Sequence, residues 1–300
     1  MLASRDDGFF VVADPQELTG WTANWPAGFR FCVWWARYAP RGRGRLPREM
    51  GRRLGRRDRF SVETMSGGRI AVNPDSWDIY TTLILSKGAW DQHVLESCCN
   101  LVRDGQVLYD IGASAGCITV EAAARFHDRV HIYAFEPQPG LARTLAISAQ
   151  LNHFKNVHVL NMMLGNEQGT GSLFITAHSV HASAVPRAKK FREIQCSISS
   201  IDWLVGEGKI PPPDAMKIDV EGSEFDVLRG ATETIRRHRP RILFESDANC
   251  KRFGYTRTDL CAFLRELADY RFEFVRVSGV TPASQDLEDP SVGDVIAMPD

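Results

Sequence analysis

An acid and two glycines follow one another at fixed spacing in the run Asp110-Ile-Gly112-Ala-Ser-Ala-Gly116. The apolar residues from Val107 to Ile111 are typical of a strand, and the residues after Gly116 are typical of a helix. Gly112 permits a tight turn and lets a ligand approach the backbone, while Gly116 lets the helix pack closely on the strand. A strand, a glycine turn and a helix in this order predict a site for a nucleoside cofactor.

A second carboxylate strengthens this prediction, because a glycine turn after a strand is often no more than a turn. The next apolar run ends at Phe135-Glu136-Pro137, which places Glu136 24 residues after Gly112. At the carboxyl end of the neighbouring strand, its side chain can accept hydrogen bonds from both hydroxyls of a ribose. The pair of features therefore indicates a ligand that contains a ribose.

The spacing of the turn also discriminates between cofactors. A dinucleotide site has the pattern G-x-G-x-x-G, whose amides receive a pyrophosphate. Here Asp110 precedes the first glycine, and an acid at that point repels a pyrophosphate but suits a cationic amino acid group. S-adenosylmethionine (SAM) has a ribose, an adenine and an ammonium group and no phosphate, so it fits these residues better than NAD does.

The elements that position these residues alternate between apolar runs and amphipathic stretches. Strands are predicted at residues 107–111, 130–135, 157–163, 215–220, 241–245, 272–277 and 292–298, and helices at 116–126, 138–151, 223–237 and 256–269. Continuous apolar strands that alternate with helices are typical of a parallel sheet covered on both faces. The sequence therefore predicts an α/β fold with a mostly parallel, seven-stranded sheet.

The first 75 residues have a different character and are predicted as an N-terminal extension of a domain that spans 76–300. They carry Trp21, Trp25, Trp34 and Trp35, and the alternation of residues 60–72 around Gly67-Gly68 predicts a β-hairpin. Between Arg41 and Arg59 there are nine arginines and two acids, a net charge of +7 in a chain whose formal net charge is -1. This segment is a separate electrostatic feature, available to an anionic partner.

Composition excludes several classes of protein. With 44% hydrophobic and 24% charged residues, the chain can bury a full core, so a disordered protein is excluded. No apolar run approaches the roughly 18 residues of a membrane span, and Asp6 and Asp7 stand where a signal peptide carries positive charge. The seven cysteines include no C-x-x-C pair, so neither a disulfide framework nor a structural zinc site is indicated, and a cytoplasmic protein is expected.

Several motifs, taken together, resemble those of the FkbM family of SAM-dependent methyltransferases. The resemblance covers about residues 75 to 250, and in order the motifs are Asp110-Ile-Gly-Ala-Ser-Ala-Gly116, Phe135-Glu-Pro137, Asn156 through Leu164-Gly165, Lys217-Ile-Asp-Val-Glu-Gly222 and Val227-Leu-Arg-Gly230. The last two are much more specific than the glycine turn. The resemblance implies a class I methyltransferase fold, SAM as cofactor and O-methylation of a hydroxyl on a sugar or natural product.

The resemblance also implies roles for individual residues. By position, Asp110, Gly112, Ala113 and Gly116 would surround the methionine part of SAM, Glu136, followed by Pro137, would hold the ribose, and Met162 or Met163 would flank the adenine. The chain departs from the family at Ser114, where Asn is usual, and at Met163, where Ala is usual.

The reaction centre is predicted at the end of the fourth strand. Transfer of a methyl group to an alcohol requires alignment of the acceptor oxygen and removal of its proton. Asp219 is the first candidate for the base and Glu221 the second, since both follow the strand directly. The alternative is that Asp219 forms a buried structural ion pair with Lys217 and that Glu221 only starts the next helix.

Other residues offer weaker candidates. Glu245, Asp247 and Asn249 end the fifth strand and, with Asp219, are oxygen ligands of the kind that Mg²⁺ prefers, but their spacing matches no recognised metal loop, so no metal is assigned. His178 and His181 lie in residues 176–195, a candidate lid after a predicted strand at 172–175, and either histidine is a possible base. Cys117 and Cys261 are most simply core residues.

Two other functions remain as alternatives. The arginines and tryptophans near the N-terminus are suited to bind an RNA backbone and its bases, which makes an RNA methyltransferase one alternative. Against it, the chain lacks the D/N-P-P-Y/F motif of enzymes that methylate base amines. A protein that binds SAM or an acceptor without catalysis is the second alternative. A small-molecule or glycan acceptor, anionic if the arginines hold it, is the favoured prediction.

Overall fold

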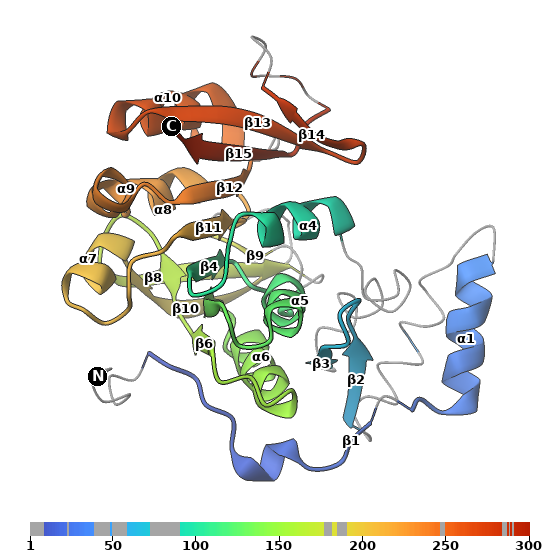
Figure 1. Cartoon of the computed structure of the whole chain (residues 1–300). Coiled ribbons are helices and arrows are strands. Elements are labelled where there is room, and N and C mark those ends of the chain that lie inside the picture. The colour runs from blue at the N-terminus through green and yellow to red at the C-terminus, as the bar shows by residue number, and fades with distance from the viewer. Residues whose placement is uncertain are drawn as a thin grey trace.

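The structure is a computed structural model that describes residues 9–22, 24–38, 49, 59–72, 91–176, 182–184, 191–246, 250–283, 287, 289 and 291–300. An eight-stranded sheet runs through its centre in the order β14-β13-β15-β12-β11-β4-β5-β6 (Figure 1). In chain order the strands are β4 (Val107–Ile111), β5 (His131–Phe135), β6 (Val157–Leu160), β11 (Ala215–Ile218), β12 (Arg241–Glu245), β13 (Tyr270–Arg276), β14 (Gly279–Pro282) and β15 (Asp294–Pro299).

The direction of the strands confirms the predicted fold class. Strands β6, β5, β4, β11 and β12 are parallel, and β15 is antiparallel to both of its neighbours, β12 and β13. This mostly parallel sheet has the class I methyltransferase arrangement that the resemblance implied. Because β4 and β11 are adjacent, the glycine turn after Ile111 and the acids after Ile218 emerge side by side.

Strand β14 extends the seven predicted strands by one. It returns against β13 after the two residues Val277 and Ser278, and Arg276 pairs with Gly279. All four residues of β14 are exposed, so the strand has no buried face from which alternation of apolar and polar residues could have revealed it.

Helices cover both faces of the sheet (Figure 1). Side chains from α4 (Gln92–Asn100), α5 (Cys117–Phe126) and α6 (Pro139–Leu151) pack on one face, and those from α7 (Ile201–Gly206), α8 (Glu224–Arg229), α9 (Thr232–His238) and α10 (Arg257–Leu267) pack on the other. None of the helices in the described part of the chain has the length and apolar character needed to cross a bilayer.

The helix predicted at 223–237 is two helices, α8 and α9, with a break at Gly230. A Cβ on Gly230 would lie 1.9 Å from the carbonyl oxygen of Gly165, so the chain passes Gly165 there at a distance that only glycine allows. Asp202 then accepts hydrogen bonds from the backbone N–H groups of Glu233 and Thr234, at 2.9 and 2.7 Å, which starts α9 afresh.

A second sheet lies beside the carboxyl ends of the main strands. Its order is β7-β10-β8-β9, with β7 (Met163–Leu164), β8 (Gly169–Thr176), β9 (Ala182–Ser183) and β10 (Phe191–Ser199). The strand predicted at 172–175 is confirmed as part of β8. Most of the candidate lid, including His178 and His181, lies outside the described residues.

The predicted hairpin is confirmed as β2 (Arg59–Glu63) and β3 (Arg69–Ala71), which pair antiparallel. The hairpin packs on α6, because Ser148 Oγ accepts from the backbone N–H of Ala71 at 2.9 Å and Asn152 Oδ1 accepts from that of Arg69 at 2.8 Å. The hairpin side chains therefore share one apolar cluster with α5 and α6. The predicted boundary between residues 75 and 76 lies outside the described residues.

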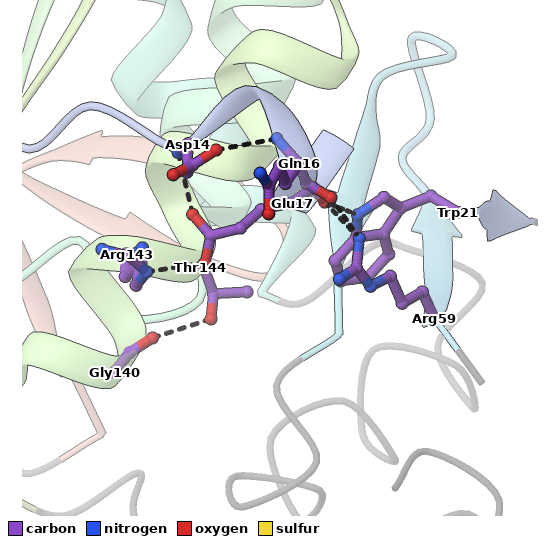
Figure 2. A network of polar contacts seen from close by, with 8 residues as sticks. All are labelled: Asp14, Gln16, Glu17, Trp21, Arg59, Gly140, Arg143 and Thr144. Atoms are coloured by element: carbon purple, nitrogen blue, oxygen red, sulfur yellow. Dashed lines mark hydrogen bonds and ion pairs between the residues drawn. The ribbon is translucent and has the colours of Figure 1, made fainter. Parts of the chain in front are cut away.

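The remaining N-terminal elements are the 3-10 helix η1 (Pro15–Leu18), β1 (Trp21–Thr22) and α1 (Ala27–Tyr38). Arg59 fixes the end of η1, since its Nη1 donates to the carbonyl oxygens of Gln16, Glu17 and Thr19 at 3.0, 3.0 and 2.8 Å (Figure 2 draws the first two). Glu17 in turn accepts from Arg143 of α6 at 2.7 Å. The other eight arginines of the run lie outside the described residues.

Candidate functional site

A cavity of about 320 Å³ opens at the carboxyl ends of β4, β5 and β11, a size within the range of small-molecule sites. Of the residues that the sequence nominated for cofactor or catalysis, those that line this cavity are Asp110, Gly112, Ala113, Glu136, Pro137, Met162, Met163, Asp219 and Glu221. Gly116 does not line it. It lies behind the wall at the start of α5, where a Cβ would come within 2.3 Å of Leu145 Cδ1.

The glycine turn is shaped by its contact with the neighbouring strand. Gly112 has a φ of +83°, and a Cβ on it would lie 1.9 Å from the carbonyl oxygen of Asp219. The backbone N–H groups of Gly112 and Ala113 both donate to the carbonyl oxygen of Phe135, at 3.0 Å each. The turn is thus fixed between β5 and the residue that follows β11, and only glycine fits its first position.

Glu136 is buried and held at both carboxylate oxygens. Its Oε2 accepts from the backbone N–H of Ser114 and its Oε1 from that of Gln138, each at 2.8 Å. Burial raises the pKa of the Glu136 carboxyl to about 7, although these two hydrogen bonds oppose the shift. Each oxygen retains a lone pair, so the side chain is preorganised to accept two further donors from the cavity.

Asp110 is buried beneath the turn. Thr119 Oγ1 donates to its Oδ2 at 2.6 Å. Its Oδ1 has no hydrogen-bond partner among the described residues and lies 3.7 Å from the Nζ of Lys217. A buried carboxylate oxygen without a donor, on the wall of a cavity, is suited to receive an N–H group of a ligand.

Lys217 connects this acid to Asp219. Its buried Nζ lies 3.2 Å from Asp219 Oδ2, and the Asp219 side chain retains 40% of its exposure. Burial acts to lower the pKa of the Lys217 ammonium, but the carboxylates of Asp219 and Asp110 outweigh it, so the pKa is raised. The ion pair considered from the sequence is therefore present, and Asp219 nevertheless lines the cavity.

Glu221 lies on the same wall, in a turn with an unusual backbone. It has a φ of +60°, which non-glycine residues rarely adopt, and Gly222 after it has a φ of +110°. Glu224, the third acid near the end of the strand, does not line the cavity but is buried beneath this turn. Glu221 is thus close to the cavity because the turn is held in a constrained form.

Part of the cavity wall was not predicted from the sequence. Asp91, Val94 and Leu95, from the start of α4, line it, and so do Leu173 of β8 and Ala184. The apolar residues of α4 recur at helical spacing, at Leu95, Cys98 and Cys99, which was the available signal for a helix. Nothing in their spacing indicated that α4 would reach the ends of strands later in the chain.

Two further carboxylates lie near Asp219. Glu245, at the end of β12, lines the cavity. Asp294 lies opposite it in the adjacent antiparallel strand β15. Burial, and then the charge of Asp219, raise the pKa of Asp294 to about 7. Within the described ranges, no three His, Cys, Asp or Glu side chains are placed to share a metal ion, and Asp247 and Asn249 lie outside those ranges.

The two cysteines that the sequence placed in the core differ in their surroundings. Cys261 is fully buried in the main apolar cluster. Cys117 begins α5 and lines the cavity, yet burial raises the pKa of its thiol to about 12, with a further contribution from Asp110. The Cys117 thiol is therefore neutral and not activated as a nucleophile.

Comparisons with known proteins give both curated relatives and solved structures to which this chain is similar. The chain is similar to the hexuronic acid methyltransferase AglP of Haloferax volcanii, at 24% identity over 146 residues, which cover 49% of this chain and 58% of AglP. It is similar to Methyltransferase 1 of Beauveria bassiana at 26% identity over 147 residues, covering 42% of this chain and 59% of that protein. The chain thus spans less than two thirds of the length of both curated relatives.

Among solved structures, the methyltransferase FkbM of Methylobacillus flagellatus has 17% identity and a TM-score of 0.46, with 75% of this chain and 53% of that chain covered. A family model described as the methyltransferase FkbM domain matches residues 110–273, which include every cavity residue from Asp110 to Glu245. Because this match spans more than half of the residues, the chain belongs to the FkbM family of SAM-dependent methyltransferases.

Proposed function

We propose that this methyltransferase transfers the methyl group of SAM to a hydroxyl of a sugar or glycan. The observation that carries the proposal is the position of Asp219. Its carboxylate is held 3.2 Å from Lys217 Nζ, its side chain is 40% exposed, and the residue lines the cavity beside the glycine turn after β4. A carboxylate fixed in this way can receive the proton that an alcohol loses as it is methylated.

The residues of the cavity fit SAM. We assign the Oδ1 of Asp110, which accepts no hydrogen bond from the described residues, to its ammonium group and the two fixed oxygens of Glu136 to its ribose hydroxyls. Met162 and Met163, which line the same cavity beyond Glu136, are assigned to the adenine. When bound, SAM supplies a methyl group on a positively charged sulfur.

The chain contributes alignment and proton transfer. Asp219 is assigned as the base, and Lys217 beneath it fixes the orientation of its carboxylate. Glu221 is assigned as a second hydrogen-bond acceptor for the hydroxyls of the acceptor. Val94, Leu95 and Leu173 form an apolar part of the wall, which reduces competition from water.

The printed name of AglP, a hexuronic acid methyltransferase, supports a sugar as acceptor. The charges of the described wall favour a neutral sugar. The side chains of Asp91, Asp219, Glu221 and Glu245 are acidic, and the ammonium of Lys217 is already paired. An anionic acceptor would need cations from outside the described residues, of which the run that begins at Arg41 is the candidate.

A radiolabelled-methyl transfer assay tests this proposal. The purified protein is incubated with labelled SAM and, separately, with neutral sugars, uronic acids, nucleotide sugars and RNA. We expect label in neutral sugars. Label in uronic acids or nucleotide sugars would contradict the expectation of a neutral acceptor. If the KM for these anionic acceptors rises steeply with salt, the arginine run that begins at Arg41 would be implicated in binding them.

Two results would contradict the proposal as a whole. Label in RNA, with a steep salt dependence of binding, would favour the nucleic-acid alternative. Calorimetric binding of SAM without transfer to any acceptor would favour a protein that binds the cofactor without catalysis.

A further inference from the structure

Glu224, at the start of α8, is buried directly beneath the turn that carries the candidate catalytic acids. Its side chain is 1% exposed. Its Oε1 accepts from the backbone N–H groups of Val220 and Gly222, each at 3.0 Å. These two residues flank Glu221 on either side, so one carboxylate oxygen of Glu224 spans the turn.

The other carboxylate oxygen contacts Tyr255. The hydroxyl oxygen of Tyr255 lies 2.6 Å from Glu224 Oε2 and 2.8 Å from the carbonyl oxygen of Gly222. A tyrosine hydroxyl has one proton, and an ionised carboxylate and a carbonyl are both acceptors. If Glu224 is ionised, the one Tyr255 proton must be shared between two acceptors. If Glu224 carries a proton, it donates to the Tyr255 oxygen while Tyr255 donates to Gly222, and each contact is then a full hydrogen bond.

The burial of Glu224 acts in the direction of the neutral form. Burial raises the pKa of its carboxyl, while the hydrogen bonds from Tyr255 and from the backbone N–H groups oppose the shift. Tyr255 is the titratable group in direct contact with Glu224, and Cys250 lies against Tyr255. Neither thiol nor phenol supplies a cation to compensate a buried carboxylate.

The turn needs such support because its backbone is constrained. Glu221 has a φ of +60° and Gly222 a φ of +110°. A Cβ on Gly222 would lie 2.3 Å from Phe253 Cε2, so this part of the turn packs tightly against the segment that leads to Tyr255. A residue such as Glu221 retains a left-handed conformation only when its neighbours determine it.

We propose that Glu224 and Tyr255 are positioning residues for methyl transfer, and that protonated Glu224 and Tyr255 together hold Asp219 and Glu221 against the cavity. The inference rests on the proposed function, because it assumes that the acids of this turn act in catalysis. Ionisation of Glu224 would draw the Tyr255 proton to the carboxylate and release the Gly222 carbonyl. The turn would then loosen, and turnover would fall as the pH rises.

Two variants and a control test the positioning role. Tyr255→Phe removes the hydroxyl and is expected to lower kcat by about tenfold or more, with little change in the Kd of SAM. Tyr270→Phe is the matched control, because the Tyr270 hydroxyl is also buried and donates to a backbone carbonyl, that of Pro240, at 2.7 Å. It should lower the Tm without a selective loss of kcat. Wild-type kcat in folded Tyr255→Phe, or an equal loss in Tyr270→Phe, would overturn the role.

Glu224→Gln tests the position of the proton. The amide imitates the neutral acid, since its oxygen accepts from the two backbone N–H groups and its NH₂ donates to Tyr255. We expect this variant to keep kcat near neutral pH and to lose the decline at higher pH. A large loss of kcat and Tm together in Glu224→Gln would overturn the assignment of the proton.

An infrared measurement separates this inference from the proposed function. The difference spectrum of wild type minus Glu224→Gln at neutral pH should contain the C=O band of a protonated carboxylic acid, whatever the acceptor is. A difference spectrum with only carboxylate bands would refute the inference and leave the proposed function intact. If the band is present and no sugar is methylated, the proposed function fails and the proton assignment stands.

Discussion

Lys217 places one ammonium between the two acids that serve different parts of the site. Its Nζ lies 3.7 Å from Asp110 Oδ1 under the glycine turn and 3.2 Å from Asp219 Oδ2 at the cavity. It also donates to the carbonyl oxygen of Gly112 at 3.5 Å. The position of the proposed base is therefore linked to the position of the proposed cofactor site through a single buried side chain.

Asp219→Asn should abolish most turnover and leave SAM binding intact. The amide preserves the shape of the side chain but does not take up a proton, so we expect kcat to fall by about 10² to 10⁴. Turnover, SAM affinity by calorimetry and Tm are measured together. Asp226→Asn is the control, because Asp226 is a half-buried acid that pairs with Arg229 at 3.6 Å and does not line the cavity.

The same three measurements distinguish the alternatives for Asp219. A joint loss of Tm, SAM binding and turnover would mean that its ion pair with Lys217 is mainly structural. Wild-type turnover in a stable variant would refute both roles. The search for the base would then move to Glu221, His178 and His181.

SAM affinity should depend on the protonation of Glu136, whose pKa burial raises to about 7. The ionised form accepts hydrogen bonds from both ribose hydroxyls. We therefore expect the Kd of SAM to decrease as the pH rises from about 6 to about 8. Glu136→Ala should weaken binding by about 1 to 3 kcal/mol, and Glu136→Gln should remove the pH dependence. A flat pH profile in the wild type would contradict the ribose assignment.

The raised pKa of the Glu136 carboxyl should also make the stability of the SAM-free protein depend on pH. Because its pKa is higher in the folded state than in the unfolded chain, the folded state binds the proton more tightly. The contribution of Glu136 to stability is then fully present below about pH 4.5 and is lost as the pH rises through about 7. The difference in Tm between wild type and Glu136→Gln should follow this pH range.

Ser114→Asn should stabilise the glycine turn. Ser114 has a φ of +51°, and Asn adopts this left-handed region far more readily than Ser. The bond from its backbone N–H to Glu136 does not depend on the side chain. We expect about 0.5 to 1 kcal/mol of added stability, a rise in Tm of about 1 to 4 °C. Ser114→Val, a β-branched change, should lower the Tm instead.

Gly112→Ala should disrupt the site by collision rather than by backbone strain alone. Gly67→Ala is a matched control, because both glycines have a φ of +83° and a Cβ at Gly67 meets nothing within 4 Å. The Gly67→Ala control should lower the free energy of unfolding by about 1 to 2 kcal/mol, because alanine is strained in a left-handed backbone. Gly112→Ala should lower the free energy of unfolding by more than the control, as thermal unfolding would measure, and should abolish SAM binding. The reason is that its Cβ would lie 1.9 Å from the carbonyl oxygen of Asp219. Equal effects of the two changes would exclude the collision.

The sequence predicted the central strands and the residues at their ends because both depend on local patterns. The five parallel strands are short, buried apolar runs, and Gly112, Glu136 and Asp219 each follow such a run within two residues. Once the strand order is known, the carboxyl ends meet at one edge of the sheet. That part of the site needs no information on side-chain packing.

The features that the sequence did not reveal depend on contacts between distant residues. The break between α8 and α9 occurs because Gly230 passes the Gly165 carbonyl, and α4 reaches the cavity by packing across the sheet. Glu224 has the sequence position of a helix-starting acid, but its buried bonds to the turn and to Tyr255 come from tertiary structure.

Residues 9–11 run along the outer edge of β6. The backbone N–H of Val11 donates to the carbonyl oxygen of Val159 at 2.8 Å, and Phe9 accepts from the N–H of Asn161 at 3.2 Å. An uncovered β6 would present unpaired backbone groups on which a second molecule could add a strand. Removal of residues 1–11 should therefore increase self-association of the protein, as light scattering would detect, even though the deletion removes no residue that lines the cavity.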